Sequence, residues 1–289
     1  MEINGQTRLC GLIGNPVEHT LSPVIHNGLA GETGQNLVYV PFHVTTGLGE
    51  AVKGAYALNI LGMNVTVPYK QAVIPYLQTI DPLAEAIGAV NTLVRTEGGY
   101  KGYNTDMTGL LRAMYSEGIR IREEKILILG AGGAARAVAF LCASEGAGKV
   151  WILNRSIEKA EAVAEEVNRH FGRQILEPMT LSDYTKLPEG QFLTIQATSV
   201  GLSPAEDEAV IEDEAFYRKV HTGYDLIYRP FTTKFMKLVQ KQGRPAYNGL
   251  KMLLYQGIIA YELWNGITVS EKNAAQIYQK MKKEMGIHE

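Results

Sequence analysis

The chain has 289 residues, of which 46% are hydrophobic and 20% are charged, and its formal net charge is −2. This composition is typical of a globular protein long enough for two domains, and it lacks the basic excess of a nucleic-acid or membrane-surface binder. The two cysteines make neither a disulfide framework nor a metal-ligand spacing. No apolar run reaches the roughly 18 residues of a membrane span, and the first residues lack the apolar core of a signal peptide. We therefore expect a cytoplasmic protein without a bound metal.

Short apolar runs alternate with stretches of helical length in the first third of the chain. Strands are predicted at 8–14, 37–44, 60–67 and 89–94, and a helix is predicted to begin at Ser22. The stretch 105–118 predicts an amphipathic helix with Asp106 in its first turn and Gly118 at its end. A domain boundary is expected just before this helix.

The same alternation continues to the end of the chain. Strands are predicted at 125–130, 149–154, 192–199 and 223–228. A helix is predicted after each of the first two strands, and two more helices are predicted at 249–266 and at about 270–284. The run at 125–130 is continuously apolar, as a strand buried on both faces must be. Strands that alternate with helices predict an α/β fold whose sheets are mostly parallel.

A glycine-rich turn follows the buried strand at 125–130. Gly130, Gly132 and Gly133 lie between this strand and the next helix, and Ala134 and Ala135 follow. A turn glycine, a glycine for close approach and a helix N-terminus together form a cradle for the pyrophosphate of a dinucleotide. The alternative is a tight strand-to-helix turn that binds nothing.

The end of the strand at 149–154 indicates which dinucleotide is bound. An NAD enzyme usually has a carboxylate near this point, where it binds the ribose hydroxyls. Here Asn154, Arg155 and Ser156 take that place. A guanidinium and a hydroxyl suit the 2′-phosphate of NADP, so the sequence favours NADP. The alternative is a serine helix cap beside a solvated arginine.

Polar side chains gather where the predicted strand at 60–67 ends. Asn64 and Thr66 share one face because side chains alternate along a strand, and Lys70 follows just after Pro68. Taken alone, Lys70 is also compatible with a solvated lysine after a turn, and Asp106 with an ordinary helix cap. A joint polar site is the better explanation of the whole group, which also includes Asn91 and Asn104.

Seven motifs occur in a fixed order and carry a resemblance to a known family. They are GNPVEHTLSPVIHN, NVTVPYK, GAVNTL, GYNTD, GAGGAARA, NRS and NGLKMLLYQG. Together they resemble the shikimate dehydrogenase family, which includes the quinate/shikimate dehydrogenases. The resemblance implies a two-domain α/β protein. A Rossmann-like NADP-binding domain is expected at 105–247, and a smaller α/β substrate domain with a mostly parallel sheet at 1–104 and 248–289.

The resemblance also implies a role for individual residues. Lys70 and Asp106 are the expected catalytic pair, since a lysine ammonium can protonate or stabilise the alkoxide that ketone reduction forms. The expected substrate-binding residues are Thr20, Ser22, Thr66, Asn91, Tyr228 and Gln256. The expected cofactor-binding residues are Gly130, Gly132, Gly133, Ala134, Asn154, Arg155, Ser156, Leu226 and Gly249. Thr20 is a departure, because the family more usually has serine there.

Three functions remain open from the sequence. The first is an NADP-dependent shikimate dehydrogenase, which reversibly reduces 3-dehydroshikimate to shikimate in aromatic amino-acid biosynthesis. The second is a quinate/shikimate dehydrogenase of quinate catabolism, and the third is a non-catalytic sensor on the same fold. In each case the expected partner is a small molecule, with no nucleic acid and no membrane, and the protein is expected to be a monomer or a homodimer.

Overall fold

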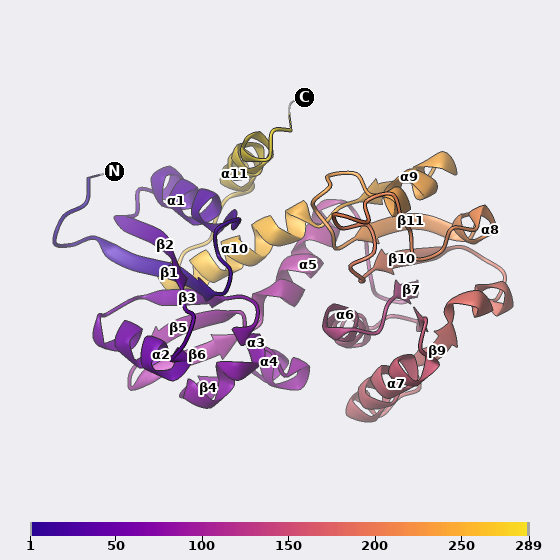
Figure 1. The fold of residues 1–289 in the computed structure, drawn as a ribbon, viewed down its shortest axis with the longest axis horizontal. Coiled ribbons are helices and arrows are strands. Elements are labelled where there is room, and N and C mark those ends of the chain that lie inside the picture. The colour runs from indigo at the N-terminus through magenta and orange to yellow at the C-terminus, as the bar shows by residue number, and fades with distance from the viewer. Residues whose placement is uncertain (1, 288–289) are drawn as a thin grey trace. The chain divides into compact units, whose positions relative to one another are not determined.

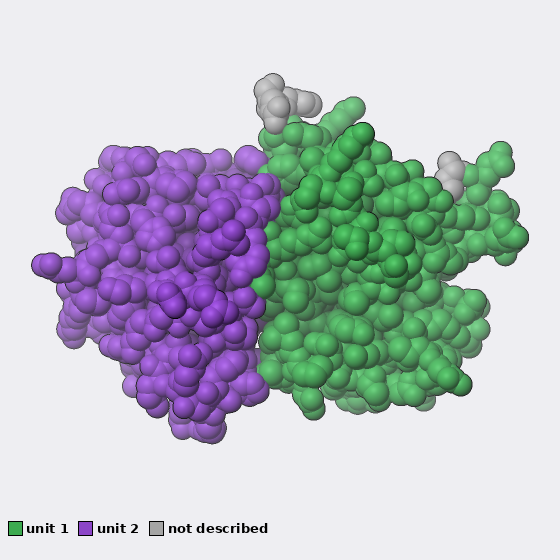
Figure 2. All heavy atoms as spheres, turned by 180° about the vertical axis from the view of Figure 1, so that it is seen from behind, with its two compact units in different colours: residues 1–112, 253–289 green, residues 113–252 purple. Residues whose placement is uncertain are grey.

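The computed structural model describes residues 2–287, which form two compact units (Figures 1 and 2). Of the described residues, unit 1 comprises 2–112 and 253–287, and unit 2 comprises 113–252. The chain passes from one unit to the other within α5 (Thr105–Ser116) and again within α10 (Leu250–Asn265). Within residues 2–287, no helix combines the length and the apolar character that crossing a membrane requires.

Unit 1 contains a six-stranded sheet in the order β2-β1-β3-β5-β6-β4. Its strands are β1 (Arg8–Gly14), β2 (Leu37–His43), β3 (Gly62–Val65), β4 (Thr79–Ile80), β5 (Thr92–Thr96) and β6 (Gly99–Tyr103). β1 pairs in parallel with both β2 and β3, and β4 pairs in parallel with β6, whereas β5 is antiparallel to β3 and β6. The carboxyl ends of β1 and β3 therefore lie at the same edge of the sheet.

Helices and one 3₁₀ turn accompany this sheet. They are α1 (Ser22–Thr33), α2 (Leu48–Ala57), α3 (Tyr69–Ala72), η1 (Ile74–Tyr76), α4 (Pro82–Ile87), α11 (Glu271–Glu284) and the unit-1 parts of α5 and α10. One core cluster includes Val65, Leu93 and Tyr100, all of which are almost completely buried. The sequence patterns did not predict α2, α4, β4 or β6. β4 has two residues, α4 has six, and β6 (GYKGY) contains two glycines, so these three give only a weak pattern.

Two strands of unit 1 differ from their predicted bounds. The strand expected at 60–67 ends at Val65, and the strand expected at 89–94 begins only at Thr92. Pro68 has no N–H for the ladder, which limits the first strand. Thr66 and Asn91 consequently lie just outside their strands, where irregular backbone can present side chains to a ligand.

Unit 2 contains a second six-stranded sheet, in the order β12-β11-β10-β7-β8-β9, in which every neighbouring pair is parallel. Its strands are β7 (Lys125–Leu129), β8 (Lys149–Asn154), β9 (Leu176–Thr180), β10 (Phe192–Gln196), β11 (Val220–Asp225) and β12 (Ala246–Tyr247). In chain order from β7, this is the 3-2-1-4-5-6 order of a Rossmann fold. The prediction of an α/β protein with a Rossmann-like sheet is confirmed.

The helices of unit 2 connect these strands. They are α6 (Gly133–Ser144), α7 (Ile157–Phe171), η2 (Leu181–Lys186), α8 (Glu214–Tyr217) and α9 (Lys234–Lys241). The strand order reverses between β7 and β10, and in such sheets ligands bind beyond the carboxyl ends of the strands at this switch point. The glycine-rich turn after β7 lies at that point.

Asp225, at the end of β11, is a buried carboxyl group that the sequence did not single out. Its Oδ2 accepts from Thr233 Oγ1 at 2.6 Å, and its Oδ1 accepts from Ile227 N at 2.9 Å and from Gln196 Nε2 at 3.3 Å. Because these bonds direct Ile227 N to the Asp225 side chain and not to a neighbouring strand, the strand expected at 223–228 ends at Asp225. They also hold the segment that carries Leu226 and Tyr228.

We expect Asp225 to make stability depend on pH. Burial raises the pKa of Asp225 from 3.8 to about 6, so the folded state holds this proton more tightly than the unfolded state. The contribution of Asp225 to the free energy of unfolding should therefore fall as the pH rises from about 4 to about 6, by about 3 kcal/mol at most.

The measurement is the free energy of unfolding of the parent and of Asp225→Asn between pH 4 and pH 7. Subtracting one from the other removes the contributions of the other carboxyl groups. We expect the parent to lose stability relative to Asp225→Asn as the pH rises. A difference that stays constant over this range would show that Asp225 does not titrate there.

Candidate functional site

An ion pair between Lys70 and Asp106 is the central feature of the candidate site in unit 1. Lys70 Nζ lies 2.7 Å from Asp106 Oδ2, and both side chains are only partly exposed. Lys70 lies on α3, just after the end of β3, whereas Asp106 lies in the first turn of α5. The structure thus brings together the two residues predicted to act as a catalytic pair.

Two hydrogen bonds donated by backbone N–H groups place Asn91 beside this pair. Val90 N donates to Lys70 O at 2.8 Å, and Thr105 N donates to Asn91 Oδ1 at 2.7 Å. Val90, which precedes Asn91, is therefore bonded to Lys70. Thr105, which precedes Asp106, is bonded to Asn91. An amine, an amide and a carboxylate from three separate segments consequently meet in one place.

Three further predicted residues follow β1 and β3 along the chain. Thr66 N donates to Ile13 O at 2.9 Å, which fixes the segment after β3 against β1. In the loop after β1, Thr20 Oγ1 donates to Ser22 Oγ at 3.1 Å and accepts from Ser22 N at 3.2 Å. Thr20 and Ser22 therefore form a hydroxyl pair.

Gln256 belongs to the same unit, whereas Tyr228 belongs to unit 2. Gln256 lies on α10 where this helix runs beside α5 (Figure 1), and a Cβ on Gly109 of α5 would lie 2.6 Å from Gln256 N. Gln256 Nε2 donates to Leu253 O at 2.9 Å. The Tyr228 side chain is half-buried in the loop after β11.

Two residues that the sequence grouped with the site have structural roles instead. Asn64 is buried and bonds with Tyr39 Oη at 2.8 Å and Thr92 Oγ1 at 3.0 Å. Asn104 donates to Ala89 O and accepts from Met107 N, so it caps α5. The prediction that Asn64 and Asn104 belong to a joint ligand site is therefore wrong, because both amides are used within the fold.

The glycine-rich turn of unit 2 fits a bound pyrophosphate. Gly130 has a φ of +112° and leaves no room for a side chain, because a Cβ there would lie 2.7 Å from Thr198 Cγ2. Gly132 and Gly133 face open space, and no side chain caps the first turn of α6. The backbone N–H groups in the first turn of α6, and the exposed Ala134 in that turn, are thus accessible to an anion.

The segment after β8 presents Arg155 to solvent. Asn154 Nδ2 donates to Ser156 O at 2.8 Å, which holds the backbone on either side of Arg155. Ser156 Oγ donates to Glu158 Oε2 at 2.7 Å, so this hydroxyl has a partner already. Arg155 is therefore the stronger of the two predicted groups for a phosphate.

The two remaining predicted cofactor residues lie next to each other in unit 2. Gly249 N donates to Ile227 O at 3.0 Å, which places Gly249 against the segment that contains Leu226. A Cβ on Gly249 would lie 2.1 Å from Leu226 O, so this approach requires glycine. Leu226 and Gly249, which are more than 20 residues apart in the sequence, are thus in contact in the structure.

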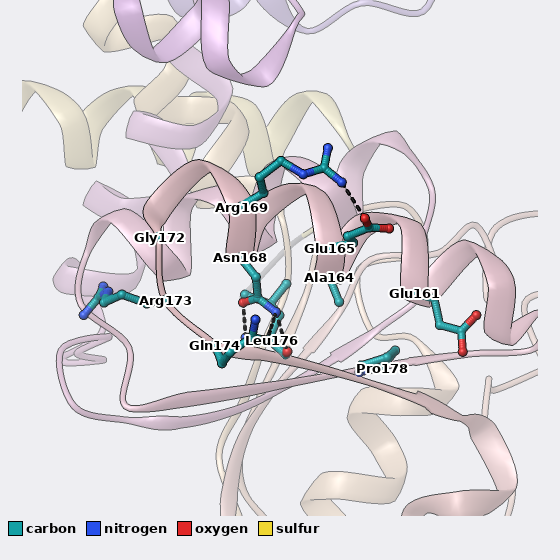
Figure 3. Close-up of a pocket in the computed structure, with 10 residues that line it drawn as sticks. All are labelled: Glu161, Ala164, Glu165, Asn168, Arg169, Gly172, Arg173, Gln174, Leu176 and Pro178. Atoms are coloured by element: carbon teal, nitrogen blue, oxygen red, sulfur yellow. Dashed lines mark hydrogen bonds and ion pairs between the residues drawn. The ribbon is translucent and has the colours of Figure 1, made fainter.

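A separate hollow lies on unit 2 between α7 and β9 (Figure 3). Its lining includes Glu161, Glu165 and Arg169 of α7 and Leu176 and Pro178 of β9. Glu165 and Arg169 form an ion pair at its rim. None of the predicted site residues lines this hollow, so it is not part of the candidate site. Among residues 2–287, no group of three or more His, Cys, Asp or Glu residues could hold a metal ion.

The Rossmann sheet with its glycine-rich turn and the amine–carboxylate pair indicate a dinucleotide-dependent oxidoreductase. Family models match the chain at residues 12–93 (shikimate dehydrogenase substrate binding domain), 113–200 (shikimate/quinate 5-dehydrogenase) and 249–276 (shikimate 5′-dehydrogenase C-terminal domain). The chain belongs to the shikimate dehydrogenase family.

Individual relatives support the same assignment. The chain is 42% identical over 278 residues to the shikimate dehydrogenase (NADP(+)) of Desulforamulus reducens, with 92% of each chain covered. A crystal structure of a shikimate dehydrogenase in complex with NADP+ is 37% identical, with a TM-score of 0.86 and coverage of 100% and 98%. The Listeria monocytogenes enzyme in complex with shikimate and NAD is 33% identical, with a TM-score of 0.88 and coverage of 96% and 98%.

Proposed function

We propose that this chain catalyses the reversible, NADP-dependent reduction of 3-dehydroshikimate to shikimate in aromatic amino-acid biosynthesis. The observation that carries the proposal is the 2.7 Å ion pair between Lys70 and Asp106 beside Asn91. A partly exposed amine held by a carboxylate is the group that ketone reduction needs for its proton. The names of the relatives support the choice of substrate and cofactor.

In this proposal Lys70 Nζ donates the proton that the C3 oxygen gains when the ketone becomes an alcohol. Asp106 keeps the ammonium in place and accepts from a substrate hydroxyl. Asn91 and Thr66 bind further ring hydroxyls, while Thr20 and Ser22 donate to the substrate carboxylate. In the oxidation direction the neutral amine of Lys70 takes the proton back.

Residues of unit 2 hold the cofactor in this proposal. The first turn of α6, with Gly132 and Gly133, binds the pyrophosphate, and Arg155 binds the 2′-phosphate. NADPH, when bound, supplies the hydride that C3 gains. Gly130 keeps the turn after β7 tight enough for this contact.

The test of the proposed function is the absorbance of NADPH at 340 nm when the purified protein is mixed with NADP and shikimate. We expect absorbance to rise, and to rise more slowly with NAD at the same concentration. Shikimate binding measured by calorimetry, with no change in absorbance between pH 7 and pH 10, would contradict the proposal and support a non-catalytic sensor.

Thr20 is expected to make shikimate a better substrate than quinate, as measured by kcat/KM. Thr20 forms the hydroxyl pair with Ser22. Threonine carries one more methyl group than the serine that the family more usually has there, and its χ1 rotation is more restricted. This methyl should hinder the tetrahedral C1 of quinate more than the planar C1 of shikimate. One misfitting group in a pocket costs about 1–3 kcal/mol, or roughly 10- to 200-fold in kcat/KM.

The measurement is kcat/KM for both acids in the parent and in Thr20→Ser. We expect Thr20→Ser to narrow the difference between shikimate and quinate. A ratio that does not change would exclude the Thr20 methyl as a determinant of specificity. A parent that prefers quinate would instead favour the quinate/shikimate dehydrogenase of quinate catabolism.

A further inference from the structure

A chain of buried hydrogen bonds crosses the sheet of unit 1 and ends at Asn91. Tyr39 Oη donates to Asn64 Oδ1 at 2.8 Å, and Asn64 Nδ2 donates to Thr92 Oγ1 at 3.0 Å. Asn64 and Thr92 face each other in the antiparallel pairing of β3 with β5. Tyr39, Asn64 and Thr92 are all buried, so water cannot replace these bonds at low cost.

Thr92 connects this chain to two residues beside the catalytic pair. Thr92 Oγ1 lies 3.2 Å from Asn91 Oδ1 and 2.9 Å from Thr105 Oγ1. Its oxygen accepts from Asn64, so its single proton remains available for Asn91 or Thr105. Thr92 is thus the junction between the core of the sheet and the first turn of α5.

The orientation of the Asn91 amide follows from its partners. Thr105 N can only donate, and it lies 2.7 Å from one atom of this amide, which must therefore be the carbonyl oxygen. Thr105 Oγ1 lies 3.2 Å from the same oxygen. Asn91 Nδ2 then points away from these groups, and within residues 2–287 it makes no hydrogen bond of its own. It is a donor held ready for an acceptor oxygen.

We propose that Thr92 is a positioning residue for substrate binding, which acts by fixing the direction of the Asn91 amide. Thr92 is completely buried, so it does not touch the substrate itself. It holds Asn91 Oδ1 and Thr105 in place, and Asp106 follows Thr105 directly. This inference rests on the proposed function, in which Asn91 donates from Nδ2 to a hydroxyl oxygen of shikimate.

The test is Thr92→Val, which keeps the shape of the side chain and removes its hydroxyl. Asn64 and Asn91 each lose a buried partner, so the amide of Asn91 is no longer held in one direction. We expect KM for shikimate to rise at least tenfold while KM for NADP changes less than twofold. Thr92→Ser keeps the hydroxyl and should restore most of the shikimate affinity.

A matched control separates this role from general damage to a sheet. Thr194, on β10 of unit 2, is also completely buried, and its Oγ1 has no hydrogen-bond partner. Thr194→Val therefore makes the same substitution without breaking a hydrogen bond, and it should leave KM for shikimate unchanged. An unchanged shikimate KM in Thr92→Val, even with a lowered Tm, would overturn the inference.

Two further results keep the test decisive. If Thr92→Val does not fold, Thr105→Val removes the other hydroxyl that reaches Asn91 Oδ1, and it should raise KM for shikimate several-fold. A folded Thr105→Val with the KM values of the parent would also overturn the inference. A parent that does not oxidise shikimate at all would instead contradict the proposed function, so the two failures are distinguishable.

Discussion

Lys70→Ala is expected to lower kcat for shikimate oxidation by at least a factor of about 100, with little change in shikimate binding. The amine lies 2.7 Å from Asp106, and the proposed reaction needs a group that exchanges a proton with the C3 oxygen. Proton transfer by a positioned side chain contributes about 10²- to 10⁴-fold to a rate. Alanine can neither exchange this proton nor stabilise an alkoxide.

Lys149→Ala provides a control of matched chemistry. Lys149 lies in unit 2, pairs with Glu177 at 3.1 Å, and exposes 33% of its side chain, the same fraction as Lys70. Loss of this surface pair should leave kcat unchanged. A Lys70→Ala protein that retains a kcat close to the parent value would remove Lys70 from the mechanism.

Asp106→Asn should also reduce kcat strongly, because asparagine cannot hold the ammonium by charge. If Lys70 and Asp106 act as one unit, the double variant should be little worse than the more damaging single variant. Fully additive effects would show instead that the two side chains act independently of each other.

Arg155→Asp is expected to reverse the cofactor preference, with a strong rise in KM for NADP and a fall in KM for NAD. Arg155 is exposed directly after β8, at the position where related folds bind the adenosine ribose. Aspartate repels the 2′-phosphate of NADP and accepts hydrogen bonds from the ribose hydroxyls of NAD. Both changes favour NAD.

Arg122→Asp is the control for Arg155→Asp. Arg122 is another exposed arginine of unit 2, and its replacement changes the net charge by the same amount. Arg122→Asp should leave KM for NADP and KM for NAD at the parent values, because salt screens long-range effects between exposed charges. An NADP/NAD ratio that is the same in Arg155→Asp and the parent would show that the 2′-phosphate binds elsewhere.

Local signals in the sequence were sufficient for much of the fold. The continuously apolar run of β7, the glycine-rich turn after it and the helix that follows are contiguous, so one stretch of sequence encodes all three. The same holds for Asp106 in the first turn of α5. The sequence patterns do not predict β6 (GYKGY) or β9 (LEPMT), because neither has a continuous apolar run and they contain glycine or proline, which are depleted in strands.

What the sequence by itself determined about this protein is therefore the α/β class, the glycine-rich turn after β7 and the set of polar residues near Lys70. Only the tertiary structure decided which of those residues are free to bind a ligand. Asn64 and Asn91 look alike in the sequence. The amide of Asn64, however, is hydrogen-bonded to Tyr39 and Thr92, whereas only the carbonyl oxygen of Asn91 is bonded and its Nδ2 can still donate. The physical reason is that a buried amide must satisfy its hydrogen bonds, and its partners come from strands distant along the chain.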